Sequence, residues 1–83
     1  MKIFYYKGRM IAYVLAIVEP LKEHTVYGEL CKNNTIAEVF PLFGEWDLII
    51  KITAEDNEEL VKHITENISN LDGILSTKTL MGY

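Results

Sequence analysis

The chain has 83 residues, of which 49% are hydrophobic, and a formal net charge of −4 at pH 7. A chain of this length forms one small domain, and its acidic balance excludes a surface that binds nucleic acid through phosphate contacts. The longest apolar run, residues 10–18, is about half of what a membrane-spanning helix needs, and a single cysteine, Cys31, leaves no partner for an intrachain disulfide. We therefore expect a cytoplasmic protein without a membrane segment.

The N-terminal part predicts an extension, a strand and a helix. Residues 1–10 are expected to form an N-terminal extension or a short extra strand, and residues 11–83 the domain itself. Ile11–Val18 is apolar on both of its alternating faces, which predicts a strand covered on both sides. Pro20 suits the first turn of a helix, and the following pattern predicts that helix over Leu21–Lys32.

The middle of the chain predicts a β-hairpin. Thr35–Phe43 has the composition of a strand, and Pro41 inside it cannot donate a hydrogen bond, so we expect this strand at an edge of the sheet or bulged. Gly44 and Glu45 then turn the chain into a third strand, Trp46–Thr53. Gly44 can adopt the positive φ that such a turn often needs.

The C-terminal part predicts a second helix and a last strand. Asp56 followed by Glu59 has the spacing of a capping box. Apolar residues then recur at helical spacing, in the clearest periodic pattern of the chain, at Leu60, Ile64, Ile68 and Leu71. Gly73 ends this helix, and Ile74–Tyr83 alternates as a strand.

The resulting order is strand–helix–strand–strand–helix–strand. Short connections and right-handed crossovers make this an α+β fold, the ferredoxin-like βαββαβ arrangement, with a four-stranded antiparallel sheet and two helices on one face. The helix-free face then keeps apolar residues that a monomer rarely exposes to water. We therefore expect a homodimer that pairs these faces and buries roughly 800 Å² per partner.

Four segments in the same order carry a family resemblance: Ala12–Val18, Gly44–Leu48, Asp56–Leu60 and Gly73–Thr79. Over roughly residues 11–81 the chain resembles the effector-binding module, or RAM domain, of the Lrp/AsnC transcription regulators. The resemblance implies the βαββαβ fold, dimers through the sheet, octamer-like rings of dimers, and a small amino-acid effector bound between dimers. Full-length members carry an N-terminal helix-turn-helix domain, so the resemblance implies a stand-alone module that modulates transcription indirectly and does not contact nucleic acid itself.

The candidate ligand-binding residues are Gly44, Glu45, Trp46, Asp47, Thr77 and Thr79. A free amino acid is a zwitterion, so its ammonium needs a carboxylate such as Asp47, and its carboxylate needs backbone N–H groups or hydroxyls. The backbone at Gly44 can approach that carboxylate closely because no Cβ intervenes. The resemblance assigns ligand contact to the Gly44–Asp47 turn.

Each candidate residue also has a purely structural interpretation. Gly44 is a normal hairpin glycine, and Asp47 could cap the turn or pair with Lys51. Trp46 could belong to the core or to a dimer interface, and both threonines are good strand formers.

Two other functions remain open at this point. One is a ligand-independent partner that assembles with full-length Lrp/AsnC regulators, and the other is a small dimeric ferredoxin-like enzyme. The second is disfavoured, because the sequence shows no catalytic triad order and no glycine-rich phosphate loop. We expect no metal and no cofactor.

Overall fold

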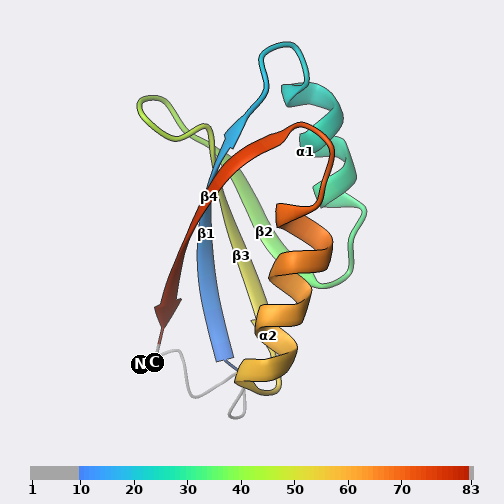
Figure 1. Ribbon diagram of the computed structural model, residues 1–83, viewed down its shortest axis with the longest axis vertical. Helices are drawn as coiled ribbons and strands as arrows, with labels where there is room; N and C mark the ends of the chain where they lie inside the picture. Colours follow the sequence, from blue (N-terminus) through green and yellow to red (C-terminus); the bar gives the residue numbers. More distant parts are fainter. Residues whose placement is uncertain (1–9, 83) are drawn as a thin grey trace.

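The computed structural model describes residues 10–82 and contains one four-stranded antiparallel sheet in the order β2-β3-β1-β4. The strands are β1 (Met10–Val18), β2 (Ile36–Pro41), β3 (Leu48–Ala54) and β4 (Ile74–Gly82). Both helices, α1 (Glu23–Cys31) and α2 (Asn57–Ile64), lie on the same side of the sheet, and α2 continues into a π-helical turn, η2 (Thr65–Ser69) (Figure 1). This arrangement confirms the predicted ferredoxin-like fold, while the strand considered for residues 1–9 lies outside the described residues.

The sheet face under the helices, called the closed face below, is the hydrophobic core. Val14 of β1 and Ile50 of β3 stand directly opposite each other on this face, and both are fully buried. Val26 and Leu30 of α1 cover one part of it, and side chains of α2 and η2 cover the rest. The buried core residues are Ala12, Val14, Ala16, Val18, Val26, Leu30, Leu48, Ile50, Ile52, Ala54, Leu60, Ile64 and Ile68.

The opposite face of the sheet carries no helix within residues 10–82 (Figure 1). Strand register places one apolar row across it, from Phe40 through Ile49 to Leu15. We call this the open face, and its apolar residues are Ile11, which is buried, and Tyr13, Leu15, Ile17, Phe40, Ile49 and Leu80. Within residues 10–82 the helices cover β1 on one side only, and the predicted covering of its other side stays a prediction.

The first helix begins later than predicted. The N–H of Lys22 donates to the carbonyl of Glu19 at 3.0 Å and closes a tight turn, in which Leu21 has a positive φ of 74°. Pro20 therefore occupies the second position of that turn, where its fixed φ is favourable, and not the first turn of α1. The helix starts at Glu23 because the turn has to reverse the chain first.

The prediction that Pro41 places its strand at a sheet edge is confirmed. β2 is an outer strand and pairs with β3 alone. Its register shifts between Ile36 and Glu38, so simple alternation along the strand breaks there. The shift brings Ile36 and Val39 to the same side, where both pack against the core.

Asp56 caps α2 as predicted, but the return hydrogen bond of the predicted capping box goes to the residue before the cap. Asp56 Oδ1 accepts a hydrogen bond from the N–H of Glu59 at 2.8 Å, and Glu59 Oε1 accepts one from the N–H of Glu55 at 2.7 Å. Along α2 and η2, the buried residues recur every four positions. An ideal α-helix has 3.6 residues per turn, so side chains at this spacing would gradually rotate away from the core. The wider turn of η2 compensates for this and keeps Ile68 buried.

Neither helix in residues 10–82 combines the length and apolar character needed to cross a membrane.

Candidate functional site

The loop between β2 and β3 is a six-residue connection, residues 42–47, at one end of the sheet (Figure 1). The N–H of Leu42 donates to the carbonyl of Asp47 at 2.8 Å and closes the base of the loop. Gly44 has a φ of +124°, as predicted for this turn, and a Cβ added there would meet no atom within 4 Å. The glycine is therefore required by the backbone conformation, and the backbone beside it is open to an approaching molecule.

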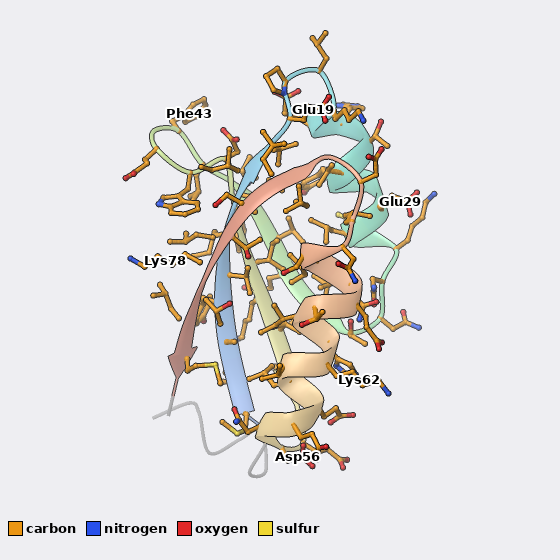
Figure 2. All side chains as sticks on the ribbon, in the orientation of Figure 1. Glu19, Glu29, Phe43, Asp56, Lys62 and Lys78 are labelled. Carbon is orange, nitrogen blue, oxygen red and sulfur yellow. The ribbon has the colours of Figure 1, made fainter. Side chains whose placement is uncertain are left out.

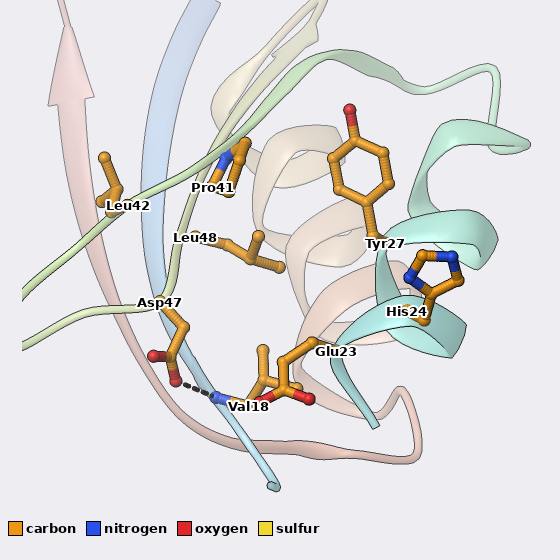
Figure 3. Close-up of a pocket in the computed structure, with 8 residues that line it drawn as sticks. All are labelled: Val18, Glu23, His24, Tyr27, Pro41, Leu42, Asp47 and Leu48. Carbon is orange, nitrogen blue, oxygen red and sulfur yellow. Dashed lines mark hydrogen bonds between the residues drawn. The ribbon is translucent and has the colours of Figure 1, made fainter. Parts of the chain in front are cut away.

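Asp47 anchors this loop to the end of β1. Its N–H donates to the carbonyl of Ala16 at 2.9 Å, and its Oδ2 accepts a hydrogen bond from the N–H of Val18 at 2.8 Å (Figure 3). The half-buried carboxylate thus extends the pairing of β1 and β3 by a side-chain hydrogen bond. Its orientation is fixed by the fold, and the second carboxylate oxygen keeps its capacity to accept a further donor.

A cleft of about 390 Å³ lies between α1 and the base of this loop (Figure 3). Glu23, His24 and Tyr27 of α1 form one wall. The lining residues among residues 10–82 are Val18, Glu23, His24, Tyr27, Pro41, Leu42, Asp47 and Leu48. Such a concave, mainly apolar surface with a few polar groups is the usual character of a small-molecule site.

The polar groups of the cleft are mainly acidic. Glu23 and Asp47 each present a carboxylate, and in Figure 3 these carboxylates lie on either side of Val18. Among residues 10–82 the lining contains no lysine or arginine, and His24 contributes an imidazole. At neutral pH the cleft therefore combines two negative charges with an apolar surface.

Three of the predicted site residues lie in the loop but outside this lining. Gly44 and Glu45 are exposed, and Trp46 is half-buried. Phe43 beside them is fully exposed and points away from the domain (Figure 2). Asp47 is thus the member of the predicted loop that reaches the cleft, and the roles of the others in binding stay predictions.

The two predicted threonines stand on β4. Thr77 pairs with Ala16 and Thr79 with Val14, so both point to the closed-face side of the sheet. Ala16 itself stands between Thr77 and Leu48, which puts Thr77 two strand spacings, or roughly 10 Å, from the start of β3. Neither threonine lines the cleft, and within residues 10–82 the fold does not bring them together with Asp47 in one pocket.

Sequence reasoning missed the α1 wall of the cleft. Glu23 and Tyr27 are four residues apart, a spacing that places two side chains on the same face of a helix. That spacing was visible in the sequence, but the packing of this face beside the β2–β3 loop is decided by where α1 sits on the sheet.

These features define a class of protein: a ferredoxin-like α+β domain with an apolar open sheet face and an acidic cleft at one end. Its family follows from comparison with known proteins. Residues 11–82 match the model of the Lrp/AsnC ligand binding domain, and the chain belongs to this family.

The most similar relatives include transcription regulators. The chain is 31% identical over 70 residues to the uncharacterized HTH-type transcriptional regulator PH0140 of Pyrococcus horikoshii. This match covers 84% of the chain and 44% of that protein. The chain is also 31% identical over 72 residues to the HTH-type transcriptional regulator FL11 of the same organism, covering 87% and 47%. The chain thus spans less than half the length of these curated relatives.

A solved structure of similar size shares the fold. The crystal structure of FFRP-DM1 superimposes with a TM-score of 0.85 at 28% identity, over 89% of this chain and 99% of that one.

Proposed function

We propose that this domain binds a small amino acid and communicates its occupancy to transcription through its state of assembly. The observation that carries the proposal is Asp47, whose carboxylate is held in fixed orientation at a cleft in a domain of the ligand-binding family. A preoriented carboxylate binds an ammonium without first paying the entropy of ordering its own side chain.

The loop backbone supplies the complementary group in this proposal. The carboxylate of the amino acid meets N–H groups beside Gly44, where no side chain blocks the approach. Thr77 and Thr79 offer hydroxyls from β4, and Glu45 and Trp46 lie close to the loop tip in sequence. In the proposed assembly these residues face the effector where two dimers meet.

The open face supports dimer formation. Leu15, Ile49 and Phe40 form a continuous row, and Phe40 and Leu80 are 56% and 45% exposed. Pairing two such faces around a twofold axis would bury roughly 800 Å² per partner, the size of an ordinary stable interface. We propose this homodimer as the unit from which octamer-like rings assemble.

Transcription would be affected through other chains in the assembly. The net charge of −4 disfavours phosphate contacts by this domain itself. The proposed partners are full-length regulators of the same family. Relatives of this chain are named HTH-type transcriptional regulators. A non-enzymatic, regulatory role follows from this proposal.

The proposal is tested by thermal unfolding in the presence of each of the twenty amino acids at millimolar concentration. A ligand at a hundred times its dissociation constant adds about 2.7 kcal/mol to the free energy of unfolding, which raises the midpoint by roughly 10–20 °C in a domain of this size. Asp47→Asn should abolish this shift while retaining an acceptor for the N–H of Val18. Glu66→Gln, an equally conservative change at an exposed residue of η2, should leave the shift intact.

One observation favours a second function, that of a ligand-independent assembly partner. The hydrogen bond from Val18 gives Asp47 a complete structural role without any ligand. A panel without any shift, together with recovery of full-length Lrp/AsnC regulators on the immobilised domain, would support a ligand-independent assembly partner and refute effector binding.

A further inference from the structure

We propose that the cleft selects an effector that carries a second positive charge: an amine or guanidinium on an apolar chain, as in a basic amino acid. The inference rests on the proposed effector site and adds its ligand class. It is carried by the juxtaposition of Glu23 from α1 with Asp47 from the β2–β3 loop across an apolar cleft (Figure 3).

The two carboxylates have different partners. Asp47 is fixed by Val18 and is the proposed acceptor for the α-ammonium. Glu23, in contrast, lies in the first turn of α1, and no hydrogen bond or ion pair to its carboxylate is found among residues 10–82. A ligand with one ammonium satisfies Asp47 only, whereas a ligand with two cationic groups satisfies both carboxylates.

Among residues 10–82, no lysine or arginine lines the cleft to neutralise Glu23. The neighbouring Lys22 directs its ammonium elsewhere, with Nζ 3.1 Å from Asp72 Oδ2 and 3.6 Å from Glu19 Oε1. Glu23 is exposed, so a cationic group of the ligand would add an ion pair there, whereas a neutral side chain would add none.

The rest of the lining suits an apolar chain between the two charges. Leu48 and Pro41 provide aliphatic surface, and the ring of Tyr27, on the same helix face as Glu23, is 40% exposed beside them. Methylene groups gain free energy by leaving water against such surface, and an aromatic ring near a cation adds a further attraction. A flexible basic side chain has both properties.

The test compares matched ligands by thermal unfolding and titration calorimetry at pH 8 and low salt. L-lysine is compared with L-norleucine, which has the same carbon chain without the ammonium, and L-arginine with L-citrulline. We expect at least about tenfold tighter binding of the charged member of each pair, because a charge-assisted hydrogen bond contributes about that much. 1,5-diaminopentane has two amines but lacks the α-carboxylate. Its binding shows whether the cleft takes a simple diamine or needs an amino acid.

Glu23→Gln provides the decisive variant, because it keeps the size of the side chain and removes the charge. It should reduce the preference for lysine over norleucine to near unity by weakening the binding of lysine. Glu29→Gln is the matched control on the same helix, outside the cleft, and should keep the full preference.

The outcomes separate this inference from the proposed function. Equal binding of lysine and norleucine, or a preference that survives in Glu23→Gln, would overturn the inference and leave amino-acid binding standing. Binding neither by any of the twenty amino acids nor by 1,5-diaminopentane would overturn both. A selective shift with 1,5-diaminopentane but with no amino acid would support the dicationic cleft and reject the amino-acid effector.

Discussion

The two faces of the sheet are built from the same strands and differ in what covers them. Ile49 and Ile50 are adjacent in β3, yet Ile50 is fully buried under the helices while Ile49 lies half-buried on the open face. The closed face is complete within residues 10–82, because α1, α2 and η2 supply its missing surface. No helix within residues 10–82 covers the open face, and the proposed dimer would cover it. A face that depends on another molecule is where assembly can be regulated without disturbing the core.

The largest expected effect on stability comes from Ile50→Ala, which is compared with Ile49→Ala on the other face of the sheet. Ile50→Ala should lower the free energy of unfolding by about 2–5 kcal/mol, because it leaves a cavity in a packed core. Ile49→Ala should cost much less in the subunit itself and instead shift light-scattering mass toward the monomer. Equal losses of stability with unchanged mass would show that the open face is not an interface.

The next effect concerns how closely α1 packs on the closed face. Gly73 has a φ of +102°, and a Cβ there would lie 2.7 Å from Val26 Cγ2. Gly73→Ala should therefore destabilise the domain by about 1–3 kcal/mol, measured by denaturant unfolding.

Gly28→Ala is the matched control for that change. Gly28 lies inside α1, and a Cβ would meet no atom within 4 Å. Alanine should stabilise the helix by about 0.5–1 kcal/mol, so the two substitutions are expected to have opposite signs. A loss of stability in Gly28→Ala would mean that α1 packs more tightly than the structure shows.

A smaller effect is expected at the start of α2, which covers the other half of the closed face. Asp56→Ala removes the acceptor for the N–H of Glu59 and should cost about 1 kcal/mol in chemical unfolding. Glu58→Ala, an exposed change in the same turn without a capping contact, should be nearly neutral. If both variants lost the same amount, the first-turn charge and not the cap would be responsible.

The smallest effect concerns the ion pair that ties the start of α1 to the turn before β4. The Asp72 carboxylate, hydrogen-bonded to Lys22 Nζ, raises the pKa of Lys22 above its ordinary value of 10.5, and Glu19 adds to the shift. A raised pKa in the folded state favours the charged form, so the contribution is complete below pH 10.5 and is lost as the pH rises through the folded value.

Lys22→Met should therefore cause only a slight loss of stability at neutral pH, since the pair is exposed. Above pH 10.5 the difference from the unmodified domain should shrink in thermal unfolding. A difference that stays constant up to pH 12 would assign the loss to the packing of the lysine stem.

Much of the architecture was predictable because its signals are local. The spacing of Leu60, Ile64 and Ile68 identified α2, and the missing N–H of Pro41 identified an edge strand. Gly44 indicated a positive φ, which the loop adopts. Each of these signals reflects a property of one residue or of one periodic segment, so no knowledge of distant contacts was needed.

The candidate site was predictable only in part. Asp47 stood out as a carboxylate at the start of an apolar strand, but its partner Val18 is 29 residues away, and their contact depends on the register of β1 and β3. Glu23 and Tyr27 had no signal that linked them to the loop, because no local pattern states where a helix lies across a sheet.

The sequence by itself determined the order and type of the elements, the edge position of β2, the cap of α2 and the apolar character of both sheet faces. Only the tertiary structure decided which face the helices cover, that Glu23 and Asp47 share one cleft, and that Thr77 and Thr79 stand apart from it. The physical reason is that propensities and periodicity act over a few residues, whereas the positions of these groups follow from the packing of segments that are distant in the chain.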